Sequence, residues 1–279
     1  KTGNGWNMYF VKTSDDINLA VYDYNPKGKK TVLLIHGWPL SHLMYEYQLE
    51  MLISCGYRVI TMDLRGFGNS DVPAGGYCYD QMAEDIYKVV CALRLNRFTL
   101  AGFSMGGAVV LRYMREFQGY GVERLILLAA AAPSWTRREG FPYGLTREYV
   151  NGLIREACTD RPRLACKFSH EQLFASCQSE PLKNWFEDIA LSASGIGTVQ
   201  AAIALRDEDG RNDLKAVEVP TVIIHGKKDV VVSSQLAEYQ HMAIQGSKLY
   251  ELENSGHGIV YDELERFNDL FLMAVEGKC

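Results

Sequence analysis

The sequence contains no Cys-x-x-Cys pair, and its seven cysteines are odd in number and scattered along 279 residues. This arrangement fits neither a disulfide framework nor a cysteine zinc site. Because disulfide-rich folds belong to oxidising compartments, we expect reduced thiols and a cytoplasmic protein. No cluster of His, Asp and Glu has the spacing of metal ligands either. We therefore expect no metal and no other cofactor.

Long apolar runs and clustered positive charge are also missing. No apolar run approaches the roughly 20 residues that a helix needs to cross a bilayer, so we expect no membrane span. Lys and Arg are interspersed with Asp and Glu, and the formal net charge is −5, which argues against a nucleic-acid partner. The chain start, Lys1 to Gly5, has neither an initiating Met nor the apolar stretch of a signal peptide. We expect a trimmed or mature form.

The sequence does contain short apolar runs separated by segments with helical spacing, such as residues 79–94. Runs that are apolar on both faces predict strands of a parallel sheet covered by helices. Two earlier runs, joined by the turn-forming Ser14-Asp-Asp, predict an antiparallel opening hairpin. A final helix is expected after Gly258. The predicted strands cover residues 7–11, 18–22, 31–35, 58–62, 98–101, 125–129, 221–224 and 248–252.

The strand signals stop between residues 134 and 215, where helical periodicity continues, as at 148–157 and 184–190. This pattern predicts a helical cap, residues 134–215, inserted into a core made of residues 1–133 and 216–279. The predicted class is therefore α/β, with a mostly parallel sheet, helices on both of its faces and an inserted cap.

The segment Gly102-Phe-Ser-Met-Gly lies between a predicted strand and a predicted helix. This is a G-x-S-x-G pattern, in which a nucleophile sits on a tight turn and glycines avoid collisions with the neighbouring strand and helix. The alternative is a turn of small residues with a solvated serine. The position after a strand and the partners further along the chain favour Ser104 as a nucleophile.

A serine hydroxyl needs a general base to take its proton, and an acid must orient that base. His257 lies in the loop Asn254-Ser-Gly-His-Gly after the last predicted strand, and Asp229 follows the preceding strand. We predict His257 as the base and Asp229 as the acid, in the order that this motif requires. The other candidates lack this context: His36 and His225 at strand ends, His42, His170 and His241 on predicted helices, and Asp207 and Asp209 in the connection from cap to core.

Acyl transfer also needs hydrogen-bond donors for the tetrahedral oxyanion. The backbone N–H of Met105, directly after Ser104, is the first candidate. The second is the N–H of Trp38, in the turn that follows the predicted strand 31–35. The Trp38 indole would then form a wall of the acyl pocket, the alternative being a buried structural tryptophan.

Five motifs occur in order along the chain: Ile35-His-Gly-Trp-Pro-Leu, Asp63-Leu-Arg-Gly-Phe-Gly-Asn-Ser, Gly102-Phe-Ser-Met-Gly-Gly, Ile224-His-Gly-Lys-Lys-Asp and Ser255-Gly-His-Gly. With them the chain resembles the α/β-hydrolases, and more narrowly the bacterial arylesterase, perhydrolase and cofactor-free haloperoxidase group. The resemblance implies a triad of Ser104, Asp229 and His257 with Trp38 and Met105 as oxyanion donors.

The same resemblance implies a pocket under the cap that includes Trp38, Trp135 and Val231. Pro39 matches the proline of family members with perhydrolase activity, in which peroxide attacks the acyl-enzyme. The cap shows no clear correspondence to the family. Three cysteines within it, Cys158, Cys166 and Cys177, have no explanation in the family pattern.

The expected function is hydrolysis of small, largely apolar carboxylic esters through an acyl-enzyme on Ser104. A lactonase, a thioesterase or a carbon–carbon bond hydrolase could use the same triad, and a non-catalytic ligand receptor could keep the same fold. Dehalogenases and epoxide hydrolases need a carboxylate where this chain has Ser104. The expected partner is a small ester, and the sequence leaves open whether the chain forms a homo-oligomer. Four cap aromatics indicate an apolar or aromatic substrate group, although such residues often fill a core: Trp135, Phe141, Trp185 and Phe186.

Overall fold

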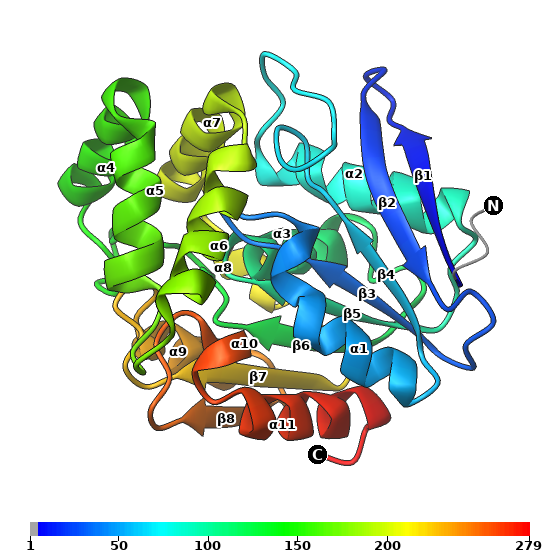
Figure 1. Cartoon of the computed structure of the whole chain (residues 1–279). Coiled ribbons are helices and arrows are strands. Elements are labelled where there is room, and N and C mark those ends of the chain that lie inside the picture. The colour runs from blue at the N-terminus through cyan, green and yellow to red at the C-terminus, as the bar shows by residue number, and fades with distance from the viewer. Residues whose placement is uncertain (1–4) are drawn as a thin grey trace.

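The computed structural model describes residues 5–279, and the expectation about the chain start concerns mainly residues 1–4, outside the described residues. Eight strands form one sheet in the order β1-β2-β4-β3-β5-β6-β7-β8 (Figure 1). β2 is antiparallel to both of its neighbours, and all other pairs from β4 to β8 are parallel. The strands are β1 (Trp6–Lys12), β2 (Asn18–Tyr24), β3 (Thr31–Ile35), β4 (Arg58–Met62), β5 (Phe98–Phe103), β6 (Val122–Leu128), β7 (Thr221–Gly226) and β8 (Lys248–Leu252).

The central strands are buried on both faces, which explains their continuous apolar sequences. Every residue of β5 and β7 is buried, and β3 is buried except at its first residue. Strand β1 lies at the edge of the sheet, where Phe10 is 60% exposed. The predicted opening hairpin and the predicted, mostly parallel sheet are both confirmed.

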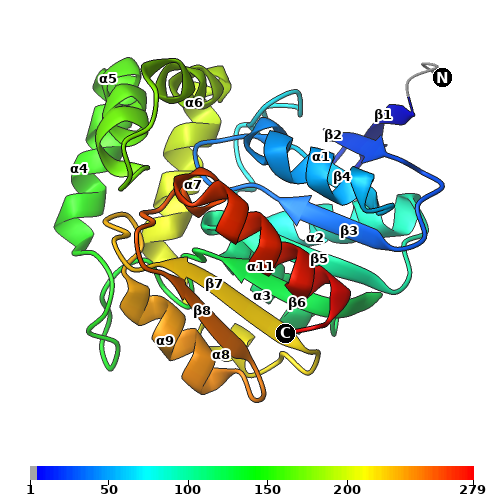
Figure 2. The same ribbon diagram turned by 60° about the horizontal axis from the view of Figure 1, so that its bottom comes forward.

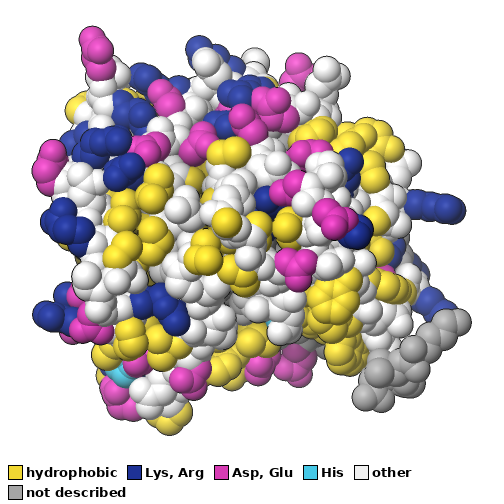
Figure 3. All heavy atoms as spheres, turned by 90° about the horizontal axis from the view of Figure 1, so that it is seen from above, with side chains coloured by type: hydrophobic (Ala, Val, Ile, Leu, Met, Phe, Trp, Pro, Cys, Tyr) yellow, Lys and Arg dark blue, Asp and Glu magenta, His cyan; other side chains and the backbone are white. Residues whose placement is uncertain are grey.

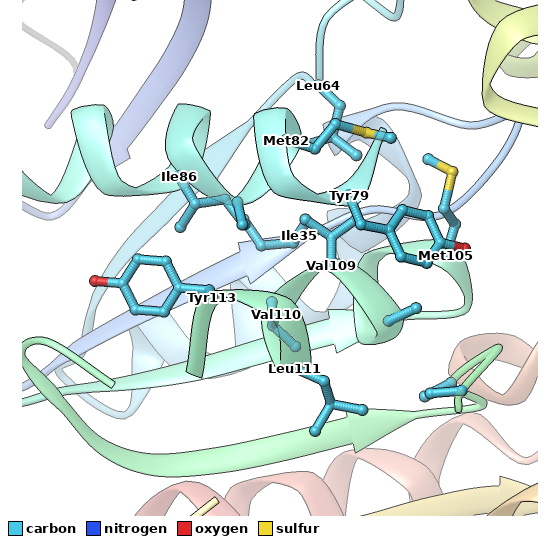
Figure 4. Close-up of a cluster of buried hydrophobic side chains, with 14 of the residues drawn as sticks. Ile35, Leu64, Tyr79, Met82, Ile86, Met105, Val109, Val110, Leu111 and Tyr113 are labelled. Carbon is cyan, nitrogen blue, oxygen red and sulfur yellow. The ribbon is translucent and has the colours of Figure 1, made fainter. Parts of the chain in front are cut away.

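Helices cover both faces of the sheet (Figure 2). The helices α1 (Glu46–Ser54) and α11 (Leu264–Glu276) pack on one face, where Leu52, Phe267 and Phe271 join the same apolar cluster. On the other face, side chains of α2 (Tyr79–Ala92) and α3 (Met105–Glu116) surround Ile35 from β3 (Figure 4). α9 (Ser234–Ala243) contributes to that second cluster as well. The helix α3 is therefore held rigidly beneath the end of β5.

The segment 134–215, which we call the cap, contributes no strand to the sheet. Its helices α4–α7 stand together beside one end of the sheet (Figure 1). The side chains of Thr146, Ser179 and Ser194 accept backbone N–H bonds at the starts of α4, α6 and α7, which fixes where these helices begin. The cap helices are α4 (Arg147–Thr159), α5 (Arg161–Lys167), the π-helical segment η2 (Phe168–Gln172), α6 (Glu180–Ser192), α7 (Gly195–Asp207) and α8 (Arg211–Leu214).

Two short helices complete the structure, η1 (His42–Tyr45) and α10 (Ile259–Asp262). Within residues 5–279 no single helix is long and apolar enough to cross a membrane. Only the pair α6 and α7, bent by 94° at its break, reaches the required length and composition together. Basic and acidic side chains are interspersed on the face of the molecule seen in Figure 3.

Candidate active site

Ser104 lies on the tight turn between β5 and α3, with a φ of 53° that non-glycine residues rarely adopt. A Cβ on Gly102 would lie 2.4 Å from the Gly106 carbonyl oxygen, so no larger residue fits there. The backbone N–H of Ser104 donates to the Leu128 carbonyl at 2.9 Å, and its own carbonyl accepts from Ala131 at 3.0 Å. The turn is therefore held on two sides, with the Ser104 side chain at the carboxyl end of β5.

The structure brings Ser104, His257 and Asp229 into a continuous hydrogen-bonded series. The His257 Nε2 lies 3.0 Å from the Ser104 Oγ, and its Nδ1 lies 2.7 Å from an Asp229 carboxylate oxygen. All three residues are buried, although His257 is 153 positions from Ser104 in the sequence. A hydroxyl, an imidazole and a carboxylate are thus within hydrogen-bonding reach, which is the arrangement that a nucleophile, a base and an orienting acid require.

The Asp229 carboxylate is held by donors on both of its oxygens. Its Oδ1 accepts from the backbone N–H groups of Val231 and Val232, each at 2.8 Å. Burial alone would raise the pKa of Asp229, but the charge of His257 and hydrogen bonds from His225 and His257 outweigh it, so this pKa lies well below its usual range. Asp229 is consequently ionised at neutral pH and can stabilise a positive imidazole.

His225, interpreted from the sequence as a structural residue at a strand end, also contacts this carboxylate. Its Nε2 lies 2.8 Å from the Val232 carbonyl and 3.3 Å from Asp229 Oδ2. Because a carbonyl only accepts, the Nε2 carries the proton and points it between the two oxygens. No sequence signal separates this role from an ordinary buried histidine, since the contact depends on how the loop 226–231 turns back.

The two predicted oxyanion donors flank Ser104 on neighbouring turns. A Cβ on Gly37, the residue before Trp38, would lie 2.9 Å from the Ser104 Cβ, so the loop after β3 runs against Ser104. In the described part of the chain, the backbone N–H groups of Trp38 and Met105 have no acceptor. Met105 is the first residue of α3, whose amino-terminal end favours negative charge.

Trp38, Trp135 and Val231 line one apolar pocket between the core and the cap. The Trp38 indole donates to the Thr198 carbonyl of α7 at 2.9 Å, and the Trp135 indole donates to the Val231 carbonyl at 2.8 Å. Both tryptophans are therefore oriented by their polar ends and present their rings to the pocket. The other residues that line it are Leu145, Tyr149, Leu153, Leu164, Phe168, Gln172 and Val230.

Apart from Trp135, sequence reasoning missed the cap residues of this pocket. Tyr149 and Leu153 on α4, and Leu164 and Phe168 on α5 and η2, are spaced four residues apart. This spacing was a usable signal, but a stripe of the same kind also forms helix cores. Of the four aromatic residues that indicated the substrate, Trp135 alone lines the pocket among the described residues. Phe141 packs against Tyr143 and Tyr239, Phe186 packs against Phe174 and Tyr261, and Trp185 lies on a separate surface groove.

The remaining histidines have other partners. The His36 Nε2 accepts from the backbone N–H of Leu64 at 3.0 Å, and the His42 Nδ1 lies 2.8 Å from Asp63. His241 is exposed and contacts the buried Ser247 hydroxyl, and His170 pairs with Glu187 within the cap. These contacts leave His257 as the histidine beside Ser104.

Comparison with known proteins gives matches over nearly the whole chain. The model of the alpha/beta hydrolase fold matches residues 30–264. The chain is 43% identical to the AB hydrolase superfamily protein YisY of Bacillus subtilis, over 94% of this chain and 97% of that protein.

Two solved structures are similar in both sequence and shape. An esterase from Exiguobacterium antarcticum aligns with a TM-score of 0.93 at 44% identity, over 96% of this chain and 98% of the other. A bromoperoxidase from Bacillus anthracis aligns with a TM-score of 0.92 at 33% identity, over 97% of this chain and 100% of the other. The chain therefore belongs to the alpha/beta hydrolase family and, as its motifs predicted, to the part of it that contains esterases and cofactor-free haloperoxidases.

Proposed function

We propose that the chain is a carboxylic ester hydrolase that acts through an acyl-enzyme on Ser104. The observation that carries this proposal is the hydrogen-bonded series from Ser104 through His257 to Asp229. The similarity of the chain to an esterase, at 44% sequence identity, supports the same reaction. The substrate would be a small, largely apolar ester, because the pocket beside Trp38 is lined mainly by apolar and aromatic side chains.

In the acylation step the Ser104 Oγ attacks the ester carbonyl carbon while His257 Nε2 takes the hydroxyl proton. The carbonyl oxygen becomes an oxyanion that accepts from the backbone N–H groups of Trp38 and Met105. The ionised Asp229 stabilises the positive imidazole and keeps its Nε2 directed at the reaction centre. The bond to the alcohol oxygen then breaks, and His257 gives its proton to the departing alkoxide, which leaves as the alcohol.

In the deacylation step a water molecule takes the place of the alcohol. His257 removes a proton from this water, whose oxygen attacks the acyl carbon and forms a second oxyanion in the same position. The bond to the Ser104 Oγ then breaks, the serine recovers its proton from His257, and the carboxylic acid is released.

We also propose that residues 134–215 act as a cap over a core of residues 1–133 and 216–279, because the pocket lies between these parts.

The test is hydrolysis of chromogenic aryl esters from acetyl to octanoyl by wild type and by Ser104→Ala, in the presence of a chelator. We expect turnover that is highest for short acyl chains and at least about 10³-fold lower in Ser104→Ala, as triad removals generally give. A matched control is Ser54→Ala, an exchange at the exposed last residue of α1. Near-normal turnover by Ser104→Ala would refute the acyl-enzyme. An absence of turnover on every ester would instead favour a carbon–carbon hydrolase or a ligand receptor.

Peracid formation is the second candidate activity. Pro39 follows Trp38, as in family members with perhydrolase activity, and the chain is 33% identical to a bromoperoxidase. Hydrogen peroxide would replace water as the attacker of the acyl-enzyme, so that the released product is a peracid. The measurement is bromide oxidation with an acetyl ester and peroxide, which we expect to depend on both Ser104 and the ester. Oxidation that continues without the ester would contradict this route.

A further inference from the structure

The cap contains a side-chain cluster that the hydrolase reaction does not use. Within the described residues, Cys166 at the end of α5, His170 in η2 and Glu187 on α6 each offer one atom that could bind a metal ion. These three atoms all lie within 4.8 Å of one another, and His170 Nε2 is 2.9 Å from Glu187 Oε2. The cluster therefore joins two cap helices that are separated in the sequence.

The local geometry explains why these side chains meet. Cys166 and His170 are four residues apart, so they lie on the same side of a helical segment. His170 belongs to the π-helical η2, a rare conformation that occurs often at functional sites. The side chains of His170 and Glu187 are only 22% and 25% exposed, so the packing of η2 against α6 limits their movement.

We propose that Cys166, His170 and Glu187 form a binding site for a divalent metal ion of the zinc type. A thiolate, an imidazole and a carboxylate are the donors that zinc binds in a tetrahedral arrangement, whereas magnesium and calcium prefer oxygen donors. Donor atoms around a tetrahedral zinc ion are about 3.3–3.6 Å apart, so side-chain shifts of about 1 Å would close the site. The fourth position would hold water.

Charges around the cluster fit a bound cation. The thiolate of Cys166 and the carboxylate of Glu187 together balance two positive charges, and the thiol would release its proton on binding. The other ring nitrogen of His170 lies 3.6 Å from Glu180 Oε2, and Lys183 holds the second oxygen of that carboxylate at 3.0 Å. At this distance Glu180 adds negative charge near His170 but does not accept a hydrogen bond from it.

The site would act on the cap rather than on the chemistry. It ties α5 and η2 to α6, and η2 also contributes Phe168, whose ring lies 6.5 Å from the Trp38 ring at the pocket. An ion would therefore stiffen the wall of the pocket without touching Ser104, His257 or Asp229. The proposal does not depend on the proposed ester hydrolysis.

The test is calorimetric titration of the whole, reduced and metal-free chain with Zn²⁺, together with Co²⁺ absorption spectroscopy. We expect one ion per chain, a higher thermal midpoint in excess Zn²⁺, and the near-ultraviolet charge-transfer band of a cobalt–thiolate bond. Cys166→Ser should abolish the band and weaken Zn²⁺ binding at least about 100-fold, and Glu187→Gln, which removes the carboxylate ligand, should also weaken Zn²⁺ binding.

Cys177→Ser is the matched control, because Cys177 is an exposed thiol of the cap outside the cluster. It should bind Zn²⁺ like the wild type, and circular dichroism should show that both serine variants are folded. The proposal is overturned if the wild type binds no ion, or if Cys166→Ser and the wild type bind equally well. Neither readout requires turnover, so failure here is distinguishable from failure of the esterase assay.

Discussion

At the residue scale, the geometry assigns a positioning role to His225. Its Nε2–H is shared between the Val232 carbonyl and Asp229 Oδ2, the oxygen that also faces His257. His225→Ala should leave this oxygen with one donor fewer and allow the carboxylate to turn. A hydrogen bond to a charged group contributes about 1.5–3 kcal/mol, and a long, shared one lies near the low end of that range. A loss of about 1.4 kcal/mol lowers a rate about tenfold. We therefore expect kcat to fall about tenfold with little change in KM.

His225→Gln provides the discriminating measurement, because the glutamine amide can still donate to Asp229. His225→Gln should recover part of the kcat that His225→Ala loses. If His225 has only a structural role, the two variants will differ in thermal midpoint but not in kcat. His241→Ala, an exposed histidine on α9, is the control and should keep wild-type kinetics. An unchanged kcat in folded His225→Ala would exclude the positioning role.

The residues with a strong local signal could be predicted from the sequence. Ser104 stands in a glycine-flanked turn between a strand and a helix, because the tight turn requires residues without a Cβ around it. Asp229 and His257 follow their strands in the expected order. His225 could not be predicted, because its contact with Asp229 forms only after the loop has folded. Phe168 had only a helical spacing that core residues share, and its place at the pocket depends on how the cap packs on the core.

At the element scale, buried Arg65 connects three parts of the structure. It donates to Asp85 on α2 through two bonds of 2.7 Å and to Asp15, in the turn between β1 and β2, at 2.8 and 3.1 Å. The hydrogen bond from Arg65 lowers the pKa of Asp15 to about 2. The pKa of an aspartate in the unfolded chain is about 3.9. The ionised Asp15 therefore stabilises the fold fully at pH values above about 3.9, and this stabilisation is lost as the pH falls through about 2.

Asp15→Asn should consequently lower the free energy of unfolding at neutral pH and matter less in acid. Because the Asp15 side chain is 40% exposed, we expect a loss of only about 1 kcal/mol or less. Urea unfolding at neutral pH and at about pH 3 would measure the difference, which should shrink in acid. Asp16→Asn, at an 82% exposed neighbour paired with Lys12, should change stability little at either pH. A loss that grows in acid would contradict this assignment.

The elements themselves differ in how far the sequence determines them. Strands β3, β5 and β7 are buried on both faces, so each appears as a continuous apolar run that has few other interpretations. Among the cap helices, α4 and α6 show a clear helical periodicity, whereas α7 does not. Which apolar stripe of a cap helix lines the pocket depends on packing between elements. Leu153 on α4 lines the pocket, whereas Trp185 on α6 lies on a separate surface groove.

At the scale of the whole molecule, the pocket lies where cap and core meet, so acyl-chain preference belongs to neither part alone. Phe168 is 2% exposed and faces Trp38 across this boundary. Phe168→Ala should open space for longer acyl chains. We expect the ratio of kcat/KM for octanoyl esters to kcat/KM for acetyl esters to rise about tenfold, because one methylene in an apolar pocket changes selectivity by about 10-fold or more. Trp185→Ala, an aromatic exchange in the cap outside the pocket, should leave the ratio unchanged. If both variants keep the wild-type ratio, the acyl chain lies elsewhere and the pocket beside Trp38 does not select the substrate.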